Sequence, residues 1–195
     1  MERRAGHGAD RAGSIVVSAA RTAPITIPAV MADGRLVPIE KMEAHRSGQL
    51  HLAVSVFVFD ENGRLLVQRR AASKYHCGGL WANTCCTHPH WDEIPSAAAP
   101  RRLREELGVA GVDLVERRTI DYRADVGGGL VEHERVTFYE GRVEADELTF
   151  DLDPAEVDAV DWWDASRLAD ALAREPEMLT PWFRIYLERF PGLAI

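Results

Sequence analysis

Cysteine and long apolar runs are scarce in this 195-residue sequence, and basic residues are fewer than acidic ones; each of these features argues against a class of protein. The three cysteines, Cys77, Cys85 and Cys86, are odd in number and two are adjacent, which argues against a disulfide framework and favours a reducing cytosol. The excess of acidic over basic residues, 31 against 23, gives a net charge of −8 and argues against nucleic-acid binding. No apolar run approaches the roughly 20 residues of a membrane span. We therefore expect a cytoplasmic protein that binds neither nucleic acid nor membrane.

Residues 1–25 differ in composition from the rest of the chain. They are rich in Arg, Ala and Gly and show no sustained hydrophobic period, so we expect a disordered tail, with a targeting segment as the alternative. The remaining residues, 26–195, are long enough to bury a core and are expected to form a single domain, as a monomer or weak homodimer.

The strand and helix patterns predict an α+β or mixed α/β layered domain. The clearest strand is 52–59, which is apolar on both faces and is therefore expected at the centre of a sheet. A turn at residues 60–63 is expected to connect this strand to an antiparallel hairpin partner. Further strands are expected at 29–31, 36–39, 112–115, 119–124, 131–143 and 157–163, and helices at 40–46, 101–108, 165–174 and from Pro181 onward.

The stretch 83–89 and the helix after it concentrate reactive side chains. Cys86 and His88 are two residues apart, so they share a face of an extended backbone. Arg102 lies three residues before Glu105 and four before Glu106, so these side chains are neighbours on a helix. The combination indicates a divalent-metal site next to a polyanion.

Other candidates have two interpretations each. Glu132 and Glu134 flank His133 and share a strand face, where they form either a solvated acidic edge or a cation site. Cys86 is either a buried structural cysteine or a reactive thiol. The same ambiguity between surface charge and ligand applies to His45, His51, His88, Arg69, Arg70 and Lys74.

Residues 87–109 resemble a degenerate Nudix box, G-x5-E-x7-R-E-U-x-E-E-x-G-U, in which U is a bulky aliphatic residue. Two positions depart from it: Thr87 replaces the first Gly, and Arg102 replaces the Glu of the R-E pair, a metal ligand in Nudix hydrolases. The matching positions are Glu93, Arg101, Leu103, Glu105, Glu106, Gly108 and Val109.

These departures resemble the type I isopentenyl diphosphate isomerases, and so does much of the chain from about residue 30 to 187. The resemblance implies a Nudix-like domain with a central mixed sheet flanked by helices. The matching segments are 40–45, 50–52, 69–74, 81–89, 101–108, 122–124, 132–134 and 180–182.

The resemblance also implies two divalent cations and an isoprenoid diphosphate substrate. The first cation, Mn²⁺, Zn²⁺ or Mg²⁺, would be bound by His45, His51, His88, Glu132 and Glu134. The second, Mg²⁺, would bind Glu106 and the Cys86 carbonyl and bridge the diphosphate. Further diphosphate ligands would be Lys41, Arg70, Lys74 and Arg102.

The implied reaction moves a double bond of isopentenyl diphosphate through a carbocation-like state to give dimethylallyl diphosphate in isoprenoid biosynthesis. Cys86 and Glu134 would exchange the protons on opposite faces of the substrate, and which of them is acid or base stays open. Tyr122 would lie beside Glu134, and Trp182 over the reacting carbons. A pyrophosphohydrolase of nucleoside diphosphate derivatives and a non-catalytic binding module are the alternatives.

Overall fold

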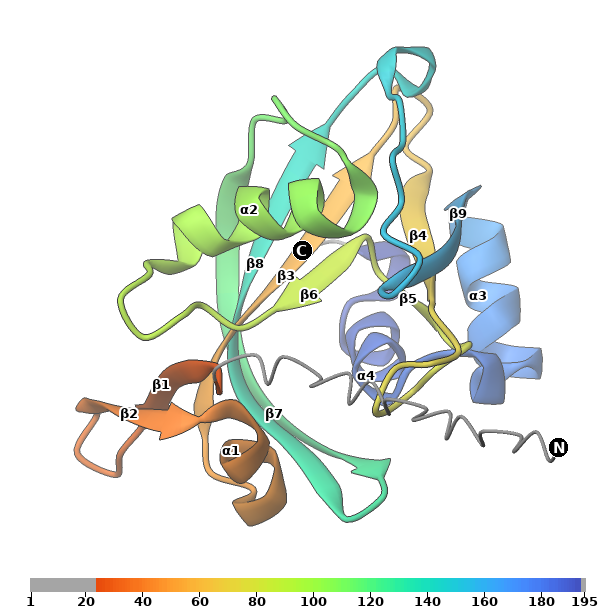
Figure 1. Ribbon diagram of the computed structural model, residues 1–195. Coiled ribbons are helices and arrows are strands. Elements are labelled where there is room, and N and C mark those ends of the chain that lie inside the picture. The colour runs from red at the N-terminus through yellow and green to blue at the C-terminus, as the bar shows by residue number, and fades with distance from the viewer. Residues whose placement is uncertain (1–23, 194–195) are drawn as a thin grey trace, which may run out of the picture.

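The computed structural model describes residues 24–193 (Figure 1). The tail expected at 1–25 therefore lies almost wholly outside the described residues. Among those described, no helix is both long and apolar enough to cross a membrane.

The described residues form a mixed sheet with helices on both faces. Its strands are β1 (Thr26–Val30), β2 (Leu36–Glu40), β3 (His51–Phe59), β4 (Leu65–Arg70), β5 (Trp81–Ala82), β6 (Cys85–Thr87), β7 (Val115–Gly127), β8 (Leu130–Arg142) and β9 (Val157–Trp163). The helices are α1 (Lys41–Ser47), α2 (Pro95–Leu107), α3 (Ala165–Arg174) and α4 (Pro181–Arg189), with short 3₁₀ turns at Ala145–Glu147, Pro176–Met178 and Pro191–Leu193.

Strand β3 is the centre of the sheet, as its two apolar faces predict. It pairs in parallel with β8 and antiparallel with β1, β4 and β6. The parallel register places His51 opposite Glu134. The antiparallel register with β6 places Ser55 opposite Cys86. Three strands therefore bring an imidazole, a carboxyl group and a thiol to one region of the sheet.

Alternate residues of β3 feed two separate cores. Val54, Val56 and Val58 pack with α2, which crosses one face of the sheet in Figure 1. Ala53, Phe57 and Phe59 belong to the opposite core, to which α3 and α4 contribute. This period of two follows from the pleat of a strand. The prediction of a mixed sheet flanked by helices is confirmed.

Two sequence expectations were wrong in detail. No separate strand covers 112–115: residues 112–114 lie outside the strands, and β7 begins at Val115. The side chains of Val112 and Leu114 instead pack against Gly141 of β8, where an added Cβ would lie 2.5 Å from Val112. The helix expected at 101–108 begins earlier, at Pro95, so Pro100 lies inside it. Pro100 leaves the Ser96 carbonyl without an intrahelical donor.

Local chemistry fixes the two helices nearest the site. The Glu40 carboxylate caps α1 by accepting hydrogen bonds from the Met42 and Glu43 amides at 2.8 and 2.9 Å. Gly108 ends α2 with φ of 71°. A Cβ there would lie 2.6 Å from Asp151, so both the backbone conformation and the close approach require glycine.

Candidate active site

A cavity of about 370 Å³ lies where α1, β4, β6, α2, β8 and α4 converge. One group of its lining side chains is cationic, and another group combines a thiol, carboxyl groups and aromatic rings. Eleven of the side chains to which the family resemblance gives a role line it: Lys41, Arg70, Lys74, Cys86, His88, Arg102, Glu106, Tyr122, Glu132, Glu134 and Trp182. His45 and His51 are not among the lining residues and are fully buried.

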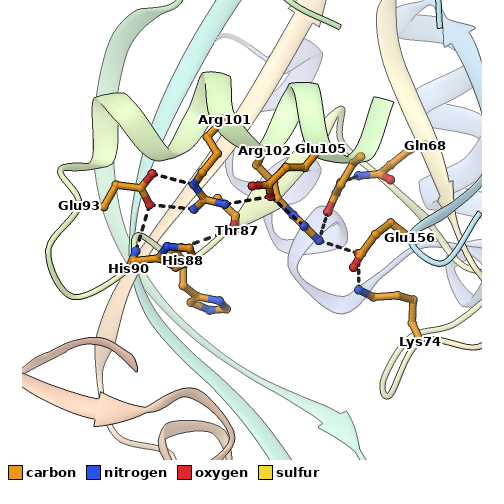
Figure 2. A network of polar contacts seen from close by, with 11 residues as sticks. Gln68, Lys74, Thr87, His88, His90, Glu93, Arg101, Arg102, Glu105 and Glu156 are labelled. Carbon is orange, nitrogen blue, oxygen red and sulfur yellow. Dashed lines mark hydrogen bonds and ion pairs between the residues drawn. The ribbon is translucent and has the colours of Figure 1, made fainter. Parts of the chain in front are cut away.

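The cationic side is organised by a chain of ion pairs, shown in Figure 2. Arg102 contacts Glu106 at 2.7 Å and Glu156 at 2.6 Å. Glu156 also pairs with Lys74. The chain continues through Glu105, which pairs with Arg102 at 3.2 Å and with Arg101 at 2.9 Å, and Arg101 in turn pairs with Glu93 at 2.7 Å. The result is a row of positive side chains fixed in place by carboxylates, of which Glu156 joins Lys74 to Arg102.

Lys41 shows how strongly positive this side of the cavity is. Burial, followed by the charges of Lys74 and Arg102, lowers the pKa of its ammonium group to about 8. Because the charged ammonium group of Lys41 is destabilised in the empty cavity, an anion that enters the cavity would stabilise it. The cavity therefore favours a multiply charged anion.

Below the cavity, three imidazoles form a compact cluster. The ring centroids of His45, His51 and His88 lie 4.9 to 5.1 Å apart. Backbone carbonyls of Lys41 and Gln49 accept hydrogen bonds from the Nδ1 atoms of His45 and His51, each at 2.7 Å. A carbonyl only accepts, so both Nδ1 atoms carry the proton and both Nε2 atoms present a lone pair.

These lone pairs fit a cation. The Nε2 atoms of His45 and His51 are buried and have no hydrogen-bond partner among the described residues. An imidazole with its Nδ1–H bound to a carbonyl and its Nε2 free is the usual form of a metal-binding histidine. Burial lowers the pKa of His88 to about 3, so that ring is also neutral, the form that binds a cation.

Two buried carboxyl groups on β8 share one phenol. The Tyr122 hydroxyl lies 2.9 Å from Glu132 Oε2 and 2.7 Å from Glu134 Oε2. A phenol has one proton, so both contacts are favourable only when one carboxyl is protonated or both face a cation. Burial and the charge of Glu134 raise the pKa of Glu132 well above its ordinary value. Burial alone would raise the pKa of Glu134, but contacts with His51 and His88 outweigh it and hold that pKa well below its ordinary value.

The five expected ligands of the first cation separate into two groups. Candidate ligand atoms lie within 4.8 Å of one another in each group. The first group is His45, His51, His88 and Glu134, and the second is His45, Glu132 and His76. The five expected ligands are thus linked only through His45, which belongs to both groups, and the second group includes His76, which the sequence analysis missed.

The neighbouring thiols point to opposite sides of β6. Cys85 is fully buried in the core beneath α2, whereas Cys86 lines the cavity. The Cys86 thiol donates to Asn83 Oδ1 at 3.1 Å and lies 3.3 Å from the Ser55 hydroxyl. The Asn83 amide is oriented by donating to the Val56 carbonyl at 3.0 Å. Burial raises the pKa of Cys86 to about 12, so the group is a neutral thiol.

Trp182 covers another side of the cavity at the start of α4. Its indole is 2% exposed, and its Nε1 atom has no hydrogen-bond partner among the described residues. The guanidinium of Arg70 lies 5.3 Å from its ring centre, so the indole touches the cationic side of the cavity as well. Thr180 is at the N-cap position of α4, but its hydroxyl makes no capping hydrogen bond.

Glu106, the expected ligand of the second cation, is held by two side chains. It accepts a hydrogen bond from Gln68 at 2.8 Å and pairs with Arg102 at 2.7 Å. The sequence analysis also missed Tyr75, which lies 5.4 Å from the Lys41 ammonium, and Glu156. Only its place just before a predicted strand could have drawn attention to Glu156, because acidic residues are common throughout 146–158.

Comparison with known proteins identifies the family to which this chain belongs. The NUDIX domain model matches residues 49–183. "Isopentenyl-diphosphate Delta-isomerase" of Dinoroseobacter shibae is 53% identical over 80% of this chain and 87% of its own length. The protein of the same name from Cereibacter sphaeroides strain KD131 is 52% identical over 80% of this chain and 86% of its own length.

Solved structures agree on the fold. DR0079 from Deinococcus radiodurans superimposes with a TM-score of 0.66 at 18% identity, over 84% of this chain and 98% of its own. A MutT NUDIX hydrolase from Burkholderia pseudomallei does so with a TM-score of 0.55 at 24% identity, over 72% of this chain and 97% of its own. These two structures share the fold of this chain at low sequence identity. Sequence identity above 50% over most of the chain is found with the isomerases. This chain therefore belongs to the isopentenyl-diphosphate Delta-isomerase family, whose members carry a NUDIX domain.

Proposed function

We propose that this chain interconverts isopentenyl diphosphate and dimethylallyl diphosphate and so serves isoprenoid biosynthesis. One observation carries the proposal: the Cys86 thiol, the Glu134 carboxyl group and the Trp182 indole line the same cavity as a group of cationic side chains. Curated relatives at about half identity bear the name of this isomerase.

The cationic side of the cavity binds the diphosphate in this proposal. Its ligands are the ammonium groups of Lys41 and Lys74 and the guanidinium groups of Arg70 and Arg102, all of which line the cavity. The Glu156 carboxylate already spans Lys74 and Arg102, so these two cations are held apart at positions that a diphosphate can bridge.

Two cation sites complete the proposal. His45, His51, His88, Glu132 and Glu134 would hold one divalent ion, with Mn²⁺, Zn²⁺ and Mg²⁺ as the candidates. Glu106 and the Cys86 carbonyl would hold Mg²⁺ against the diphosphate. When bound, the ions supply positive charge that acidifies the Glu134 carboxyl group and neutralises the diphosphate. The unpartnered Nε2 atoms of His45 and His51 support the first site.

The reaction adds a proton to C4 of isopentenyl diphosphate and removes one from C2. The C3–C4 double bond supplies the electron pair for the new C–H bond, and the C2–H pair becomes the C2–C3 double bond. Cys86 and Glu134 are the two proton-exchanging groups that we assign. Tyr122 holds Glu134 in position through a hydrogen bond of 2.7 Å. Because the reaction is reversible, each group acts as acid in one direction and base in the other.

Between the two transfers, C3 carries positive charge that water would trap. Trp182 and Tyr122 are 2% and 3% exposed, so the carbon skeleton would lie against aromatic faces shielded from solvent. The hydrolase alternative has no comparable support, because Arg102 stands at a position where the Nudix box has a carboxylate and pairs with Glu106 and Glu156 instead.

Compartment and assembly are finer parts of the proposal. All three cysteines are free thiols, which supports a reducing cytosol. We propose a monomer or weak homodimer, because each group assigned to the reaction comes from one chain.

Incubation with isopentenyl diphosphate and Mg²⁺ tests the function. We expect an acid-labile allylic diphosphate, and a strong chelator is expected to abolish its formation. Added Mn²⁺ or Zn²⁺ together with Mg²⁺ is expected to restore it. No allylic product from protein whose cation content has been verified by elemental analysis would refute the isomerase proposal.

Trp182 is expected to contribute through the face of its ring. Cation–π stabilisation of a desolvated cation is about 2 kcal/mol, roughly thirtyfold in rate when it is realised only in the transition state. Trp182→Leu is therefore expected to lower kcat about thirtyfold with little change in KM, whereas Trp182→Phe retains much of the activity. If the two variants have equal kcat values and equal melting temperatures, Trp182 contributes only by packing and the cation–π role is wrong.

Lys41 is expected to limit activity at alkaline pH. Because its pKa is about 8 in the free protein, the ammonium loses its proton above that pH and diphosphate binding weakens. We expect kcat/KM to fall by up to about tenfold per pH unit above pH 8, and kcat to fall only at higher pH because bound diphosphate retains the proton. Lys41→Arg is expected to remove this alkaline decrease. If the pH profile of Lys41→Arg is identical to that of the parent, the alkaline decrease in kcat/KM comes from another group.

A further inference from the structure

We propose that His76 is an additional ligand of the divalent cation that binds His45, so that the site contains four imidazoles and two carboxyl groups. This inference rests on the proposed cation site and extends it. The ligand group formed by His45, His76 and Glu132 is the observation that carries it, because its candidate ligand atoms lie within 4.8 Å of one another and all three residues are buried.

The distance between His76 and Glu132 suits two ligands of one ion. His76 Nε2 lies 3.6 Å from Glu132 Oε1, which is beyond hydrogen-bond range. Two ligands bound to one ion at about 2.1 Å lie roughly 3 to 4.2 Å apart, depending on whether they are cis or trans. The His76 ring is also stacked at 27° to that of His45, with 6.1 Å between the ring centroids.

His76 is placed by a tightly closed loop between β4 and β5. The Gly79 amide donates to the Arg70 carbonyl at 3.0 Å, and the Arg70 amide donates to the Leu80 carbonyl at 2.9 Å. The Arg70 guanidinium donates to the carbonyl of His76 itself at 3.4 Å. Cys77, the next residue, has φ of 52°, a conformation that non-glycine residues rarely adopt. These contacts fix the direction in which the imidazole enters the site.

The buried state of His76 needs an explanation that packing alone does not give. Its side chain is 5% exposed, and its Nδ1 atom has no hydrogen-bond partner among the described residues. An unpaired buried polar atom costs about 1 to 3 kcal/mol. Together with the free Nε2 atom of His45, it marks a polar site that requires a ligand. Coordination through Nδ1 would remove this cost, and coordination through Nε2 would give the buried ring a cation as its partner.

A fourth imidazole changes which ions the site prefers. Imidazole suits Zn²⁺, Fe²⁺ and Ni²⁺, whereas Mg²⁺ favours carboxylate, carbonyl and water ligands. Six protein ligands would leave an ion there no open position for substrate, and the residues that hold it would keep Glu132 and Glu134 in place. Ligation by His76 would therefore shift the preference of this site further from Mg²⁺ towards a transition-metal ion.

Titration of the metal-free full-length chain with Co²⁺ tests the inference. The visible d–d absorption of Co²⁺ reports its coordination, and competition with a chelator gives its Kd. His76→Gln keeps a polar side chain in the loop but lacks the imidazole, so it separates ligation by the ring from general polarity at this position. We expect at least tenfold weaker Co²⁺ binding and a more intense spectrum, as coordination falls from six to five.

Two further variants are matched to it. His45→Gln is expected to lose Co²⁺ binding almost completely. His133→Gln removes an imidazole from the opposite face of β8, where its Nδ1 donates to the Gly48 carbonyl. This variant is expected to bind Co²⁺ with the affinity and spectrum of the parent. Parent-like affinity and spectrum in His76→Gln, with binding lost in His45→Gln, would overturn the inference and leave the proposed cation site intact. Parent-like binding in both variants would overturn both.

Stability is controlled by melting each metal-free variant. If His76→Gln melts well below the parent, X-ray absorption of the Co²⁺-loaded parent decides the question instead. Four coordinated imidazoles would support the inference, and three would overturn it.

Discussion

Replacing Cys86 with alanine is expected to abolish isomerisation in a protein that remains folded. The thiol lines the cavity and is one of the two groups that exchange protons with the substrate in our proposal. Loss of a positioned acid–base group costs roughly 10² to 10⁴ in rate, and no other thiol can replace this one because Cys85 points to the opposite side of β6. We expect kcat to fall at least about 10³-fold, with diphosphate affinity retained.

Cys85→Ala is the matched control, one residue away on the same strand. Cys85 is fully buried between β3 and α2, so its truncation is expected to cost about 1 kcal/mol of unfolding free energy. That corresponds to a melting temperature roughly 2 to 4 °C lower, with near-parental kcat. Comparable losses of kcat in both variants, at comparable melting temperatures, would contradict the assignment of Cys86.

Replacing Glu134 with glutamine is expected to have an even larger effect. The carboxyl group contacts His88 at 2.8 Å, His51 at 3.8 Å and the Tyr122 hydroxyl at 2.7 Å, so one side chain would serve as proton-exchanging group and cation ligand. An amide can neither gain nor lose a proton here and is a weaker cation ligand. We expect kcat to fall roughly 10⁴-fold or more, together with a lower cation content by elemental analysis.

Glu140→Gln provides the control for Glu134. Glu140 is a buried glutamate on the same strand and pairs with Arg117 and Arg142 at 3.0 and 2.9 Å, away from the cavity. Its replacement is expected to affect melting temperature while cation content and kcat stay near those of the parent. Isomerase activity and cation content in Glu134→Gln as high as in Glu140→Gln would remove Glu134 from the mechanism.

The elements with strong local patterns were predicted well, and those that depend on distant packing were not. The apolar run at 52–59 identified β3, and the strand 157–163 and the helix 165–174 match β9 and α3 in both bounds. The expected strand at 112–115 failed because apolar residues there pack as irregular chain against Gly141. The start of α2 was missed because Pro95 and Pro100 obscure the helical pattern of small residues between them.

The candidate site shows the same division. Cys86, Glu132 and Glu134 lie in strands, where residues two apart share a face. Spacing alone therefore predicted that Cys86 shares a face with His88, and Glu132 with Glu134. His76 lies in a loop without periodicity, and Glu156 in an acidic stretch, so neither stands out in the sequence. Their proximity to the cavity arises from the pairing of β4 with β5 and β9, which joins segments almost a hundred residues apart.

Lys41 and Lys74 are the only two lysines among the 195 residues, and both line the cavity. Positive charge elsewhere on the chain comes from arginine, which amine-directed reagents do not modify. Succinimidyl dyes, biotinylation reagents and amine-coupled sensor surfaces therefore have the two cavity lysines as their only side-chain targets, and the lowered pKa of Lys41 leaves more of its amine in the nucleophilic form near neutral pH. Labelling with and without diphosphate ligand thus becomes a direct footprint of the anion pocket, whereas immobilisation of this protein requires chemistry that spares amines.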